Sequence, residues 1–405
     1  MLGRKASGCL KTSWADCREV ITWPVGQFWH ISDLHLDPEY NASGDPLQVC
    51  PSAGSQPVSS AGVWGDYLCD APWILINSSI YAMKALLPSP DFILWTGDDT
   101  PHVPNEKLGE EAVLKIVKHL TELIRLVFPE TKVYAALGNH DFHPKNQFPA
   151  GRNNIYNQVA DLWRPWLNNE SISQFKEGAF YTERLPGPNQ TGRIVVLNTN
   201  LYYTSNEQTA GLDDPASQLR WLDDVLNNAS REGEKVYVTG HLPPGFFEKT
   251  RNKAWFRPSF NQRYVEIIRK YHHVIAGQFF GHHHTDSFRM FYDDTGDPIS
   301  VMFLVPGVSP WKTTLPGVNN GANNPGIRVW YYDRDTLQLQ EGRSRLRRLS
   351  IIWVTPGHGH ILFKPHPRQP ACPKVGEGVS TDRSLPGPGW LSSLHAAGAG
   401  PDYAG

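Results

Sequence analysis

Residues of metal-ligand type follow strand-like segments at five places along this chain. The five segments are Asp33-Leu34-His35, Gly97-Asp98, Gly138-Asn139-His140-Asp141, Gly240-His241 and Gly281-His282-His283-His284. Each follows an apolar, β-branched or aromatic run, and all but the first place a glycine directly before an Asp, Asn or His. Carboxylate, amide carbonyl and imidazole groups are ligands that divalent cations accept. Five such segments in one chain predict a two-metal hydrolytic site.

A site with two metals needs a bridging carboxylate, because dications about 3.5–4 Å apart repel each other strongly. The predicted ligands are Asp33, His35, Asp98, Asn139, His241, His282 and His284. Asp98 is the predicted bridge. The D-x-H and H-x-H spacings would place both ligands of a segment on one face of an extended chain. A metal-bound water of lowered pKa would then supply hydroxide as the nucleophile.

Two further histidines are assigned to substrate chemistry rather than to metal binding. His140 stands beside Asn139 but faces the other side of an extended chain, which suits a general acid that protonates the leaving oxygen. Asp141 is expected to orient His140 by a hydrogen bond. His102 follows Asp98 closely enough to reach the substrate phosphate or to assist protonation. His283 faces away from its neighbours and is not assigned to the site.

Alternating strand-like and helical periods between residues 27 and 333 would position these segments. The predicted strands are Gln27–Ile31, Phe92–Thr96, Lys132–Leu137, Arg193–Asn198, Lys235–Thr239, Val274–Phe280, Val301–Val305 and Ile327–Tyr332. The predicted helices are Trp73–Leu87 behind an Asp70 cap, Val113–Val127, a helix that starts at Asp214-Pro215, and Phe260–Tyr271. This alternation predicts an α/β domain whose sheets are covered by helices. The ligand segments stand at the carboxyl ends of five strands, where binding crevices of α/β sheets form.

Composition limits the classes of protein to which the chain can belong. Of 405 residues, 40% are hydrophobic and 19% are charged, and the formal net charge is −2. This balance argues against a nucleic-acid binder held by bulk electrostatics. No segment approaches the run of about 18 apolar residues that a membrane-spanning helix needs. A soluble protein without nucleic-acid partners is expected.

Two features favour export and one opposes it. Cys50 and Cys69 bracket a Gly/Ser/Pro-rich loop, which a disulfide would stabilise by about 3 kcal/mol. Two buried free thiols are the alternative. The N-x-[ST] sequons at Asn41, Asn77, Asn169, Asn189 and Asn228 are candidate glycosylation sites. Against export, residues 1–25 lack the apolar stretch of about 7–15 residues that a signal peptide needs, and are treated as an atypical N-terminal extension.

The chain changes character after about residue 340, which leaves residues 26–340 as the predicted catalytic domain. Arg343, Arg345, Arg347 and Arg348 crowd together, and the remainder of the chain is rich in Pro, Gly, Ser and His. Because no sustained helical or strand period appears, residues 341–405 are predicted to be a largely disordered tail. The short run Leu349–Val354 is the exception considered.

The order D-x-H, G-D, G-N-H-D, G-H and G-H-x-H resembles the signature of calcineurin-like metallophosphoesterases. Three longer segments narrow the resemblance to the acid sphingomyelinase-like phosphodiesterases, and within them to the B branch: FWHISDLHLDP at 28–38, WTGDDTPHVP at 95–104 and GQFFGHHH at 277–284. The resemblance covers about residues 26–340. It implies a double β-sandwich flanked by helices in four αββα layers, and hydrolysis of a phosphodiester or phosphate.

The resemblance also implies roles for individual residues. One zinc ion would be held by Asp33, His35, Asp98 and His284, and a second by Asp98, Asn139, His241 and His282. His140 matches the proton donor of the family, and His102 matches a histidine beside the substrate phosphate. A Cys50–Cys69 disulfide, N-glycosylation and a lumenal or extracellular setting are implied as well.

The substrate implied is a sphingomyelin-like phospholipid headgroup or a nucleotide. A monomer that associates with membrane surfaces is expected, and the B branch implies a glycolipid anchor. The chain departs from the family at both ends. Residues 1–25 do not resemble its signal peptide. From about Glu341 the basic tail stands where the family has a helical, cysteine-rich region, and no anchor signal remains.

Two other functions are considered. A monoesterase similar to the purple acid phosphatases would have G-D-x-x-Y at the second segment and a purple absorbance, whereas this chain has Pro101 at the tyrosine position. A non-catalytic, membrane-associated regulatory protein that retains the fold is the other alternative. The presence of every ligand position opposes it. A His140→Ala substitution that left the biological effect intact would favour it.

Overall fold

The computed structural model describes residues 25–42, 45–186, 192–247, 253–312 and 324–340, and the backbone of residues 351–354 and 361–364. The predicted extension at residues 1–25 lies outside these residues except for Val25, which begins the first strand. Most of the predicted tail at 341–405 also lies outside them. Within the tail, β11 (Ile351–Val354) falls in the run that the sequence singled out and pairs antiparallel with β12 (Ile361–Lys364).

Two six-stranded sheets form the centre of the described structure. The first has the order β12-β11-β10-β1-β2-β3, and the second has the order β4-β5-β6-β7-β9-β8. The first contains β1 (Val25–Ile31), β2 (Phe92–Trp95), β3 (Lys132–Ala135) and β10 (Gly326–Asp333). The second contains β4 (Tyr181–Arg184), β5 (Gly192–Val196), β6 (Lys235–Thr239), β7 (Ile275–Phe280), β8 (Ser287–Tyr292) and β9 (Pro298–Leu304). Strands β1, β2 and β3 are parallel, as are β5, β6, β7 and β9, so their carboxyl ends lie at common edges.

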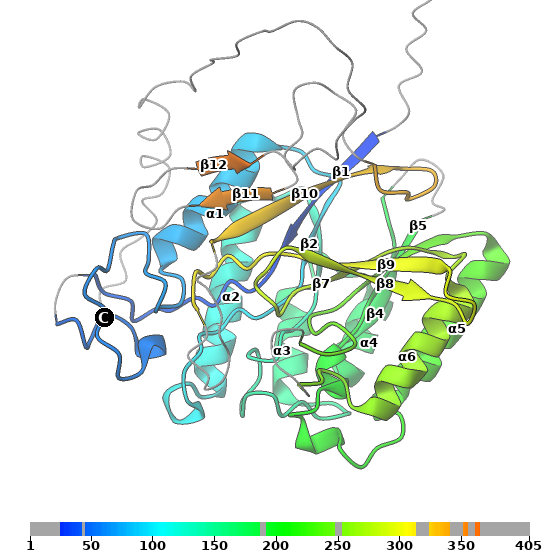
Figure 1. The fold of residues 1–405 in the computed structure, drawn as a ribbon, viewed down its shortest axis with the longest axis horizontal. Helices are drawn as coiled ribbons and strands as arrows, with labels where there is room; N and C mark the ends of the chain where they lie inside the picture. Colours follow the sequence, from blue (N-terminus) through cyan, green and yellow to red (C-terminus); the bar gives the residue numbers. More distant parts are fainter. Residues whose placement is uncertain are drawn as a thin grey trace, which may run out of the picture.

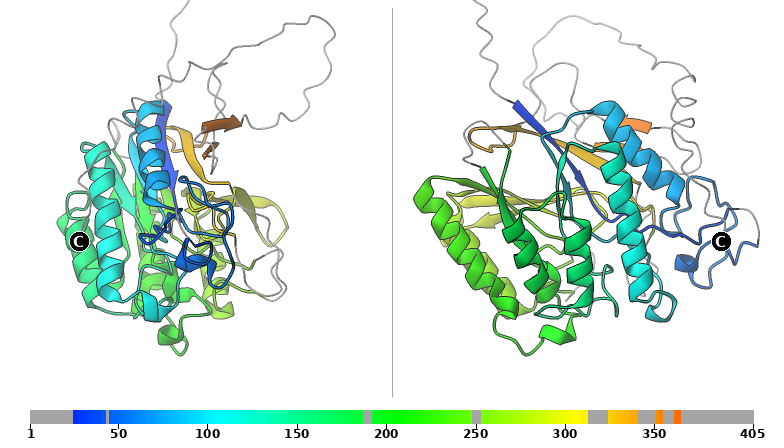
Figure 2. Two further views of the ribbon diagram at one scale, coloured as in Figure 1. Left: turned by 90° about the vertical axis from the view of Figure 1, so that its left-hand side faces the viewer. Right: turned by 180° about the vertical axis from the view of Figure 1, so that it is seen from behind.

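Helices cover the outer faces of the two sheets, as the αββα prediction requires. In Figure 1, α1 (Trp73–Leu86) and α2 (Glu110–Val127) lie on one side of the sheets, and α5 (Gln218–Glu232) and α6 (Pro258–Tyr271) lie on the other. From behind, Figure 2 shows α3 (Asn154–Leu162) and α4 (Asn169–Gly178) between these pairs. The layered fold is confirmed. None of the helices in the described part combines the length and the hydropathy that a membrane span requires.

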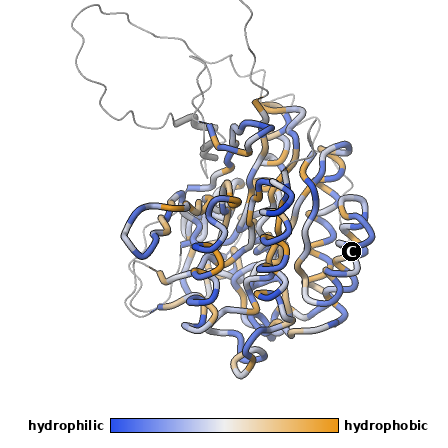
Figure 3. Tube along the Cα trace, turned by 90° about the vertical axis from the view of Figure 1, so that its right-hand side faces the viewer, coloured by the Kyte–Doolittle hydropathy of each residue, from blue (hydrophilic) through white to orange (hydrophobic). Residues whose placement is uncertain are grey.

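Aromatic side chains join the two sheets into one core. The ring of Phe28 on β1 stacks on Phe92 of the neighbouring β2, with 4.5 Å between centroids. It also contacts Tyr237 and Phe279 of the second sheet, at 5.8 and 5.5 Å. The helices contribute one-sided apolar faces, and blue and orange alternate along them in Figure 3. This core fixes β1, β6 and β7, and therefore the loops that leave their carboxyl ends.

The helix and strand predictions missed elements in two regions and were wrong about the start of two helices. Helices α3 and α4 and the antiparallel edge strands β4 and β8 were not predicted. Asp70 was predicted to cap the first helix, but α1 has Pro72 as its N-cap residue and no side-chain cap hydrogen bond. The carboxylate of Asp70 instead binds His102, 32 residues further along the chain. The helix predicted to start at Asp214-Pro215 begins at Gln218, after a short 3-10 turn at Pro215–Ser217, although the Asp214 carboxylate does accept from the N–H groups of Leu219 and Arg220 in its first turn.

Candidate metal centre

The loops after β1, β2, β3, β6 and β7 bring all seven predicted ligands together. Adjacent loops are joined by backbone hydrogen bonds, which set the relative positions of the side chains. The N–H of Asp33 donates to Gly97 O at 2.8 Å, and the N–H of His35 donates to Asp98 O at 2.9 Å. In the second sheet, the N–H of Gly281 donates to His241 O at 3.0 Å. Rigid strand ends therefore present the ligands.

Asp33, His35 and His284 form the first group of donor atoms, with one ligand atom of each within 4.8 Å of the others. His284 Nε2 lies 3.3 Å from Asp33 Oδ1 and 3.1 Å from His35 Nε2. The Nδ1 of His35 donates to Thr100 O at 2.7 Å, which leaves Nε2 directed at the group. All three side chains are buried.

Asp98, His241 and His282 form the second group. His241 Nε2 lies 3.1 Å from Asp98 Oδ2 and 3.1 Å from Asn139 Oδ1. The Nδ1 of His241 donates to Thr96 O at 2.7 Å, so this ring is oriented in the same way as that of His35. The amide of Asn139 thus joins the second group through its oxygen.

Asp98 lies between the two groups. Its Oδ2 is 3.1 Å from His241 Nε2 in the second group and 3.6 Å from His35 Nε2 in the first. Its Oδ1 accepts a hydrogen bond of 2.8 Å from the N–H of His140. This is the geometry expected of a bridging carboxylate, because one oxygen faces both groups while the other is held by the backbone.

The backbone conformation of the ligand segments differs from the one assumed in the prediction. Five of the predicted ligands have positive φ values: Asp33 (52°), His35 (40°), Asp98 (60°), His282 (69°) and His284 (54°). The argument from alternation in an extended chain is therefore wrong, although the residues it selected do converge. Left-handed conformations of residues other than glycine are strained, and they persist where the surrounding structure fixes them.

Two glycines allow these loops to pack against each other. Gly97 has a φ of 83°, and a Cβ atom there would lie 2.2 Å from the nitrogen of Gly138. A Cβ atom on Gly138 would lie 2.1 Å from the nitrogen of Asp98. Gly97, before Asp98, and Gly138, before Asn139, thus let the two loops approach each other closely.

The charges of the buried groups depend on one another. Burial acts to raise the pKa of Asp98, but the neighbouring His241, His140 and His35 outweigh it and hold that pKa well below its usual range. Burial likewise acts to lower the pKa of His241, and Asp98 outweighs it and raises the pKa to about 9. For Asp33, burial is the largest influence on the pKa of the carboxyl group and raises it. The carboxylate of Asp98 is thus kept ionised by its surroundings.

The donor atoms of both groups fit divalent cations. In the described part of the chain, the buried His282 Nε2 has no hydrogen-bond partner. The Nδ1 of His241 donates to Thr96 O, and its Nε2 is directed at one oxygen of Asp98 and one of Asn139. His35 and His284 direct their Nε2 atoms at each other. A cation between these atoms would satisfy all of them, and imidazole with carboxylate is a donor set that zinc accepts.

The two histidines assigned to substrate chemistry lie beside the first group. Ring nitrogens of His35, His102 and His140 lie within 4.8 Å of one another. The Nδ1 of His140 lies 3.3 Å from Pro101 O, and burial lowers the pKa of His140 well below its usual value. The role predicted for Asp141 is wrong. Its carboxylate accepts from the backbone N–H groups of Gly138, Asp98, Asp99 and Thr100, and so ties two loops together.

Comparison with known proteins identifies the family. Residues 26–286 match the model of the calcineurin-like phosphoesterases. The chain is 76% identical to acid sphingomyelinase-like phosphodiesterase 3b of Mus musculus over 317 residues. The aligned residues make up 78% of this chain and 70% of that protein. The Homo sapiens protein of the same name is 74% identical, with the same coverage. The Homo sapiens cyclic GMP-AMP phosphodiesterase SMPDL3A is 41% identical over 337 residues, covering 80% of this chain and 73% of that protein.

The chain belongs to the acid sphingomyelinase-like phosphodiesterases. Membership confirms the family and the B branch predicted from the sequence segments, and it assigns this acid sphingomyelinase-like phosphodiesterase to the metallophosphoesterase enzymes. The two donor groups described above are able to hold the divalent metals that such enzymes use.

The structure also locates the export-related residues of this acid sphingomyelinase-like phosphodiesterase. Cys50 and Cys69 form a disulfide with 5.8 Å between their Cα atoms, as the resemblance implied, so the alternative of free thiols is wrong in this structure. The sequon residues Asn41, Asn169 and Asn228 are exposed, and Asn77 is half-buried on α1. Asn189 lies outside the described residues.

Sequence reasoning missed several residues that position the site. The carbonyl groups of Thr96 and Thr100 orient His241 and His35, and no side-chain signal could have revealed them. Asn146 accepts from the Nδ2 of Asn139 at 2.9 Å, which directs the amide oxygen of Asn139 towards His241. Asn146 has a φ of 70°, a conformation that asparagine tolerates well. The sequence does contain this second asparagine, seven residues after Asn139 in a Pro-containing loop, and it could have been proposed as the partner of Asn139.

Proposed function

We propose that this chain is a zinc-dependent phosphodiesterase that hydrolyses a phosphodiester or a phosphoanhydride. The observation that carries the proposal is the carboxylate of Asp98 between two groups of buried donors. One zinc ion would be held by Asp33, His35, Asp98 and His284, and the other by Asp98, Asn139, His241 and His282. When bound, two zinc ions supply charge stabilisation to the phosphoryl oxygens and lower the pKa of an attacking water.

The residues of the chain orient this chemistry before substrate arrives. One oxygen of Asp98 accepts from the N–H of His140, which holds the carboxylate between the two groups. The carbonyl groups of Thr96 and Thr100 hold the rings of His241 and His35 with Nε2 inward. Little reorganisation is then required when the phosphate binds, and preorganised charge of this kind contributes strongly to catalysis.

His140 is proposed as the general acid and His102 as the group beside the substrate phosphate. The backbone of His140 is held at both ends, since its N–H binds Asp98 and its carbonyl accepts from the Thr100 hydroxyl at 2.7 Å. With Nδ1 on the side of Pro101 O, Nε2 is the nitrogen available to the leaving oxygen. A proton held at that atom would be transferred as the phosphorus–oxygen bond breaks.

The substrate class is inferred from the chemistry that the relatives share. One is named for its likeness to sphingomyelinase and another for cyclic GMP-AMP hydrolysis, and both a sphingomyelin headgroup and a cyclic dinucleotide contain a phosphodiester. We propose one of these as the substrate. An extracellular or cell-surface monomer, with N-glycosylation at the exposed sequons and association with membrane surfaces, completes the proposal.

Removing the metals is expected to abolish activity reversibly. The purified chain, loaded with zinc, should bind two zinc ions and hydrolyse at least one of bis(p-nitrophenyl) phosphate, sphingomyelin in vesicles, a cyclic dinucleotide or ATP. Dialysis against a chelator should lower the rate by about 10³-fold or more, and added zinc should restore it. Metal content is measured by mass spectrometry of the protein solution alongside the rate.

The other outcomes of this experiment would either contradict the proposal or identify the substrate class. Full metal content without hydrolysis of any of the four substrates would contradict the proposal and favour the non-catalytic alternative. Activity that persists in the chelated protein would contradict the role of the metals. Hydrolysis of sphingomyelin but not of nucleotides, or the reverse, would choose between the two substrate classes.

A further inference from the structure

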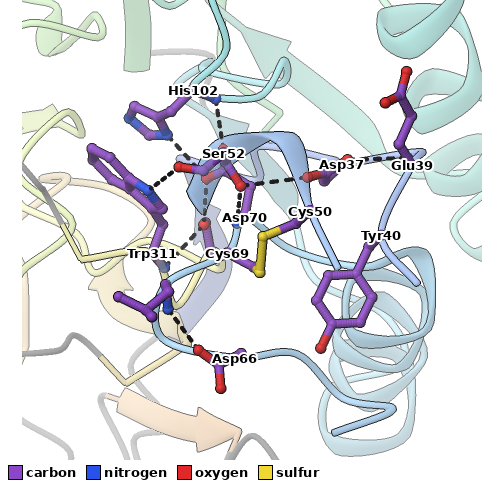
Figure 4. The surroundings of a disulfide bond; sticks show 12 residues. Asp37, Glu39, Tyr40, Cys50, Ser52, Asp66, Cys69, Asp70, His102 and Trp311 are labelled. Carbon is purple, nitrogen blue, oxygen red and sulfur yellow. Dashed lines mark hydrogen bonds and ion pairs between the residues drawn. A yellow bond between two sulfur atoms is a disulfide. The ribbon is translucent and has the colours of Figure 1, made fainter. Parts of the chain in front are cut away.

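Asp70 is a buried carboxylate outside the two donor groups, and both of its oxygens are used on one histidine. Oδ2 accepts from the backbone N–H of His102 at 2.6 Å, and Oδ1 accepts from His102 Nδ1 at 2.9 Å. The hydroxyl of Ser309 also donates to Oδ1, at 3.0 Å. Figure 4 shows Asp70 directed at His102 from the segment after Cys69. A single carboxylate thus forms hydrogen bonds with both the main chain and the ring of His102.

The hydrogen bond from the ring to Asp70 determines which nitrogen of His102 is available to substrate. A carboxylate only accepts hydrogen bonds, so the Nδ1 bound to it must carry a proton. Nε2 is then the nitrogen left for substrate. The ring is also held between other rings. That of Trp311 stacks on it with 3.7 Å between centroids and an angle of 14°, and those of His35 and His140 lie at 4.1 and 4.4 Å.

The disulfide-closed loop supports Asp70 and Trp311 at the same time. Cys69 precedes Asp70 directly and is bonded to Cys50. In this loop the hydroxyl of Ser52 accepts from the N–H of Asp70 at 2.8 Å. The carbonyl of Ser52 accepts from Trp311 Nε1 at 3.3 Å. Ser52 therefore links Asp70, which forms hydrogen bonds with His102, to Trp311, which stacks on the ring of His102.

We propose that Asp70 is a positioning residue for the hydrolysis, acting through His102. It fixes the imidazole with Nδ1–H towards Asp70 and Nε2 towards the substrate phosphate, and Trp311 and the Cys50–Cys69 loop hold this arrangement. The inference rests on the proposed phosphodiesterase function, because it concerns the histidine placed beside the phosphate in that function. It adds a residue that belongs to none of the five ligand segments.

Asp70→Asn is the test substitution, because asparagine keeps the size of the side chain but offers only one acceptor oxygen. One of the two bonds to His102 must be lost, or the Nδ1 proton must move to Nε2. With bis(p-nitrophenyl) phosphate as substrate and the zinc-loaded full chain, kcat should fall by about 10- to 100-fold. Zinc content should stay at the wild-type value, since Asp70 belongs to neither donor group.

A double-mutant cycle separates positioning from a general structural effect. In a His102→Ala background, Asp70→Asn should lower kcat by less than about 2-fold, because the residue through which it acts is gone. Asp37→Asn is the matched control. Asp37 is a buried carboxylate 3.4 Å from the Ser52 hydroxyl in the same network, without contact to His102, and its substitution should leave kcat within about 3-fold.

A second variant covers the case in which Asp70→Asn does not fold. Ser309→Ala removes one hydrogen bond from Asp70 Oδ1 and should lower kcat by about 2- to 5-fold, again with no effect in the His102→Ala background. An Asp70→Asn protein within about 3-fold of wild type, or losses that multiply with His102→Ala in both variants, would overturn the inference. An inactive wild type with full zinc content would instead contradict the proposed function.

Discussion

Asp98→Asn is expected to lower kcat/KM by about 10³-fold or more. Asparagine keeps the shape of the side chain and the acceptor for the His140 N–H, but it removes the negative charge between the two donor groups. Without that charge, two dications about 3.5–4 Å apart repel each other with little compensation. The zinc content of the purified variant should fall below two ions per chain.

Asp99→Asn is the matched control for the bridge. Asp99 is the next residue, is equally buried, and accepts from Trp95 Nε1 at 2.9 Å, but it belongs to neither donor group. Burial and the nearby Asp141 raise its pKa well above the usual range, so asparagine replaces a group that favours its neutral form. The control should keep two zinc ions and most of the activity. An Asp98→Asn protein with two zinc ions and wild-type kcat/KM would show that Asp98 does not bridge.

His140→Gln is expected to lower kcat by about 10²- to 10⁴-fold for a substrate whose leaving group is a strong base. Glutamine can still fill the space and accept or donate a hydrogen bond, but it cannot deliver a proton. With bis(p-nitrophenyl) phosphate the loss should be much smaller, because the nitrophenolate leaves without protonation. Comparing kcat for sphingomyelin or a cyclic dinucleotide with kcat for the nitrophenyl ester measures the difference.

The control for the general acid lies three residues further along the same loop. His143 is half-buried, and the structure places it in neither donor group. His143→Gln should therefore leave both rates within about 3-fold. Equal losses for both leaving groups in the His140→Gln protein, together with lost zinc, would assign His140 to metal binding or folding instead of proton donation.

The residues of the candidate centre were predictable because their chemistry is local. A ligand-type residue directly after a strand is visible in the sequence, and parallel strands bring such positions to one edge. Asp33, Asp98 and His241 were selected on this basis and lie together in the structure. The alternation argument chose the correct histidines for the wrong reason, because the loop conformations are left-handed and are imposed by contacts between loops.

The roles of Asp70 and Asp141 could not be predicted from their neighbours in the sequence. Each stands where a local role was plausible, as a helix cap or as the partner of the adjacent histidine. In the structure, Asp70 binds His102, and Asp141 binds N–H groups more than 40 residues away as well as that of Gly138. Buried carboxylates take the donors that the fold provides. The assignment of such groups requires tertiary structure, which strand and helix periods do not contain.

The elements that were missed have a similar explanation. β4 reads Tyr-Thr-Glu-Arg and lies at a sheet edge, where polar residues are tolerated and no apolar period is needed. The exposed positions of β8 include Phe288 and Met290, so its pattern does not alternate as a half-buried strand should. β8 is specified by its pairing with β9 rather than by burial of its own side chains.

The location of the bound metals tests the central claim most directly. Crystals of the zinc-loaded chain, measured at the zinc absorption edge, should give two anomalous peaks about 3.5–4 Å apart on either side of the Asp98 carboxylate. One peak should lie among Asp33, His35 and His284, and the other among Asn139, His241 and His282. A single peak, or two peaks that do not share Asp98, would contradict the two-metal centre on which the proposed hydrolysis depends.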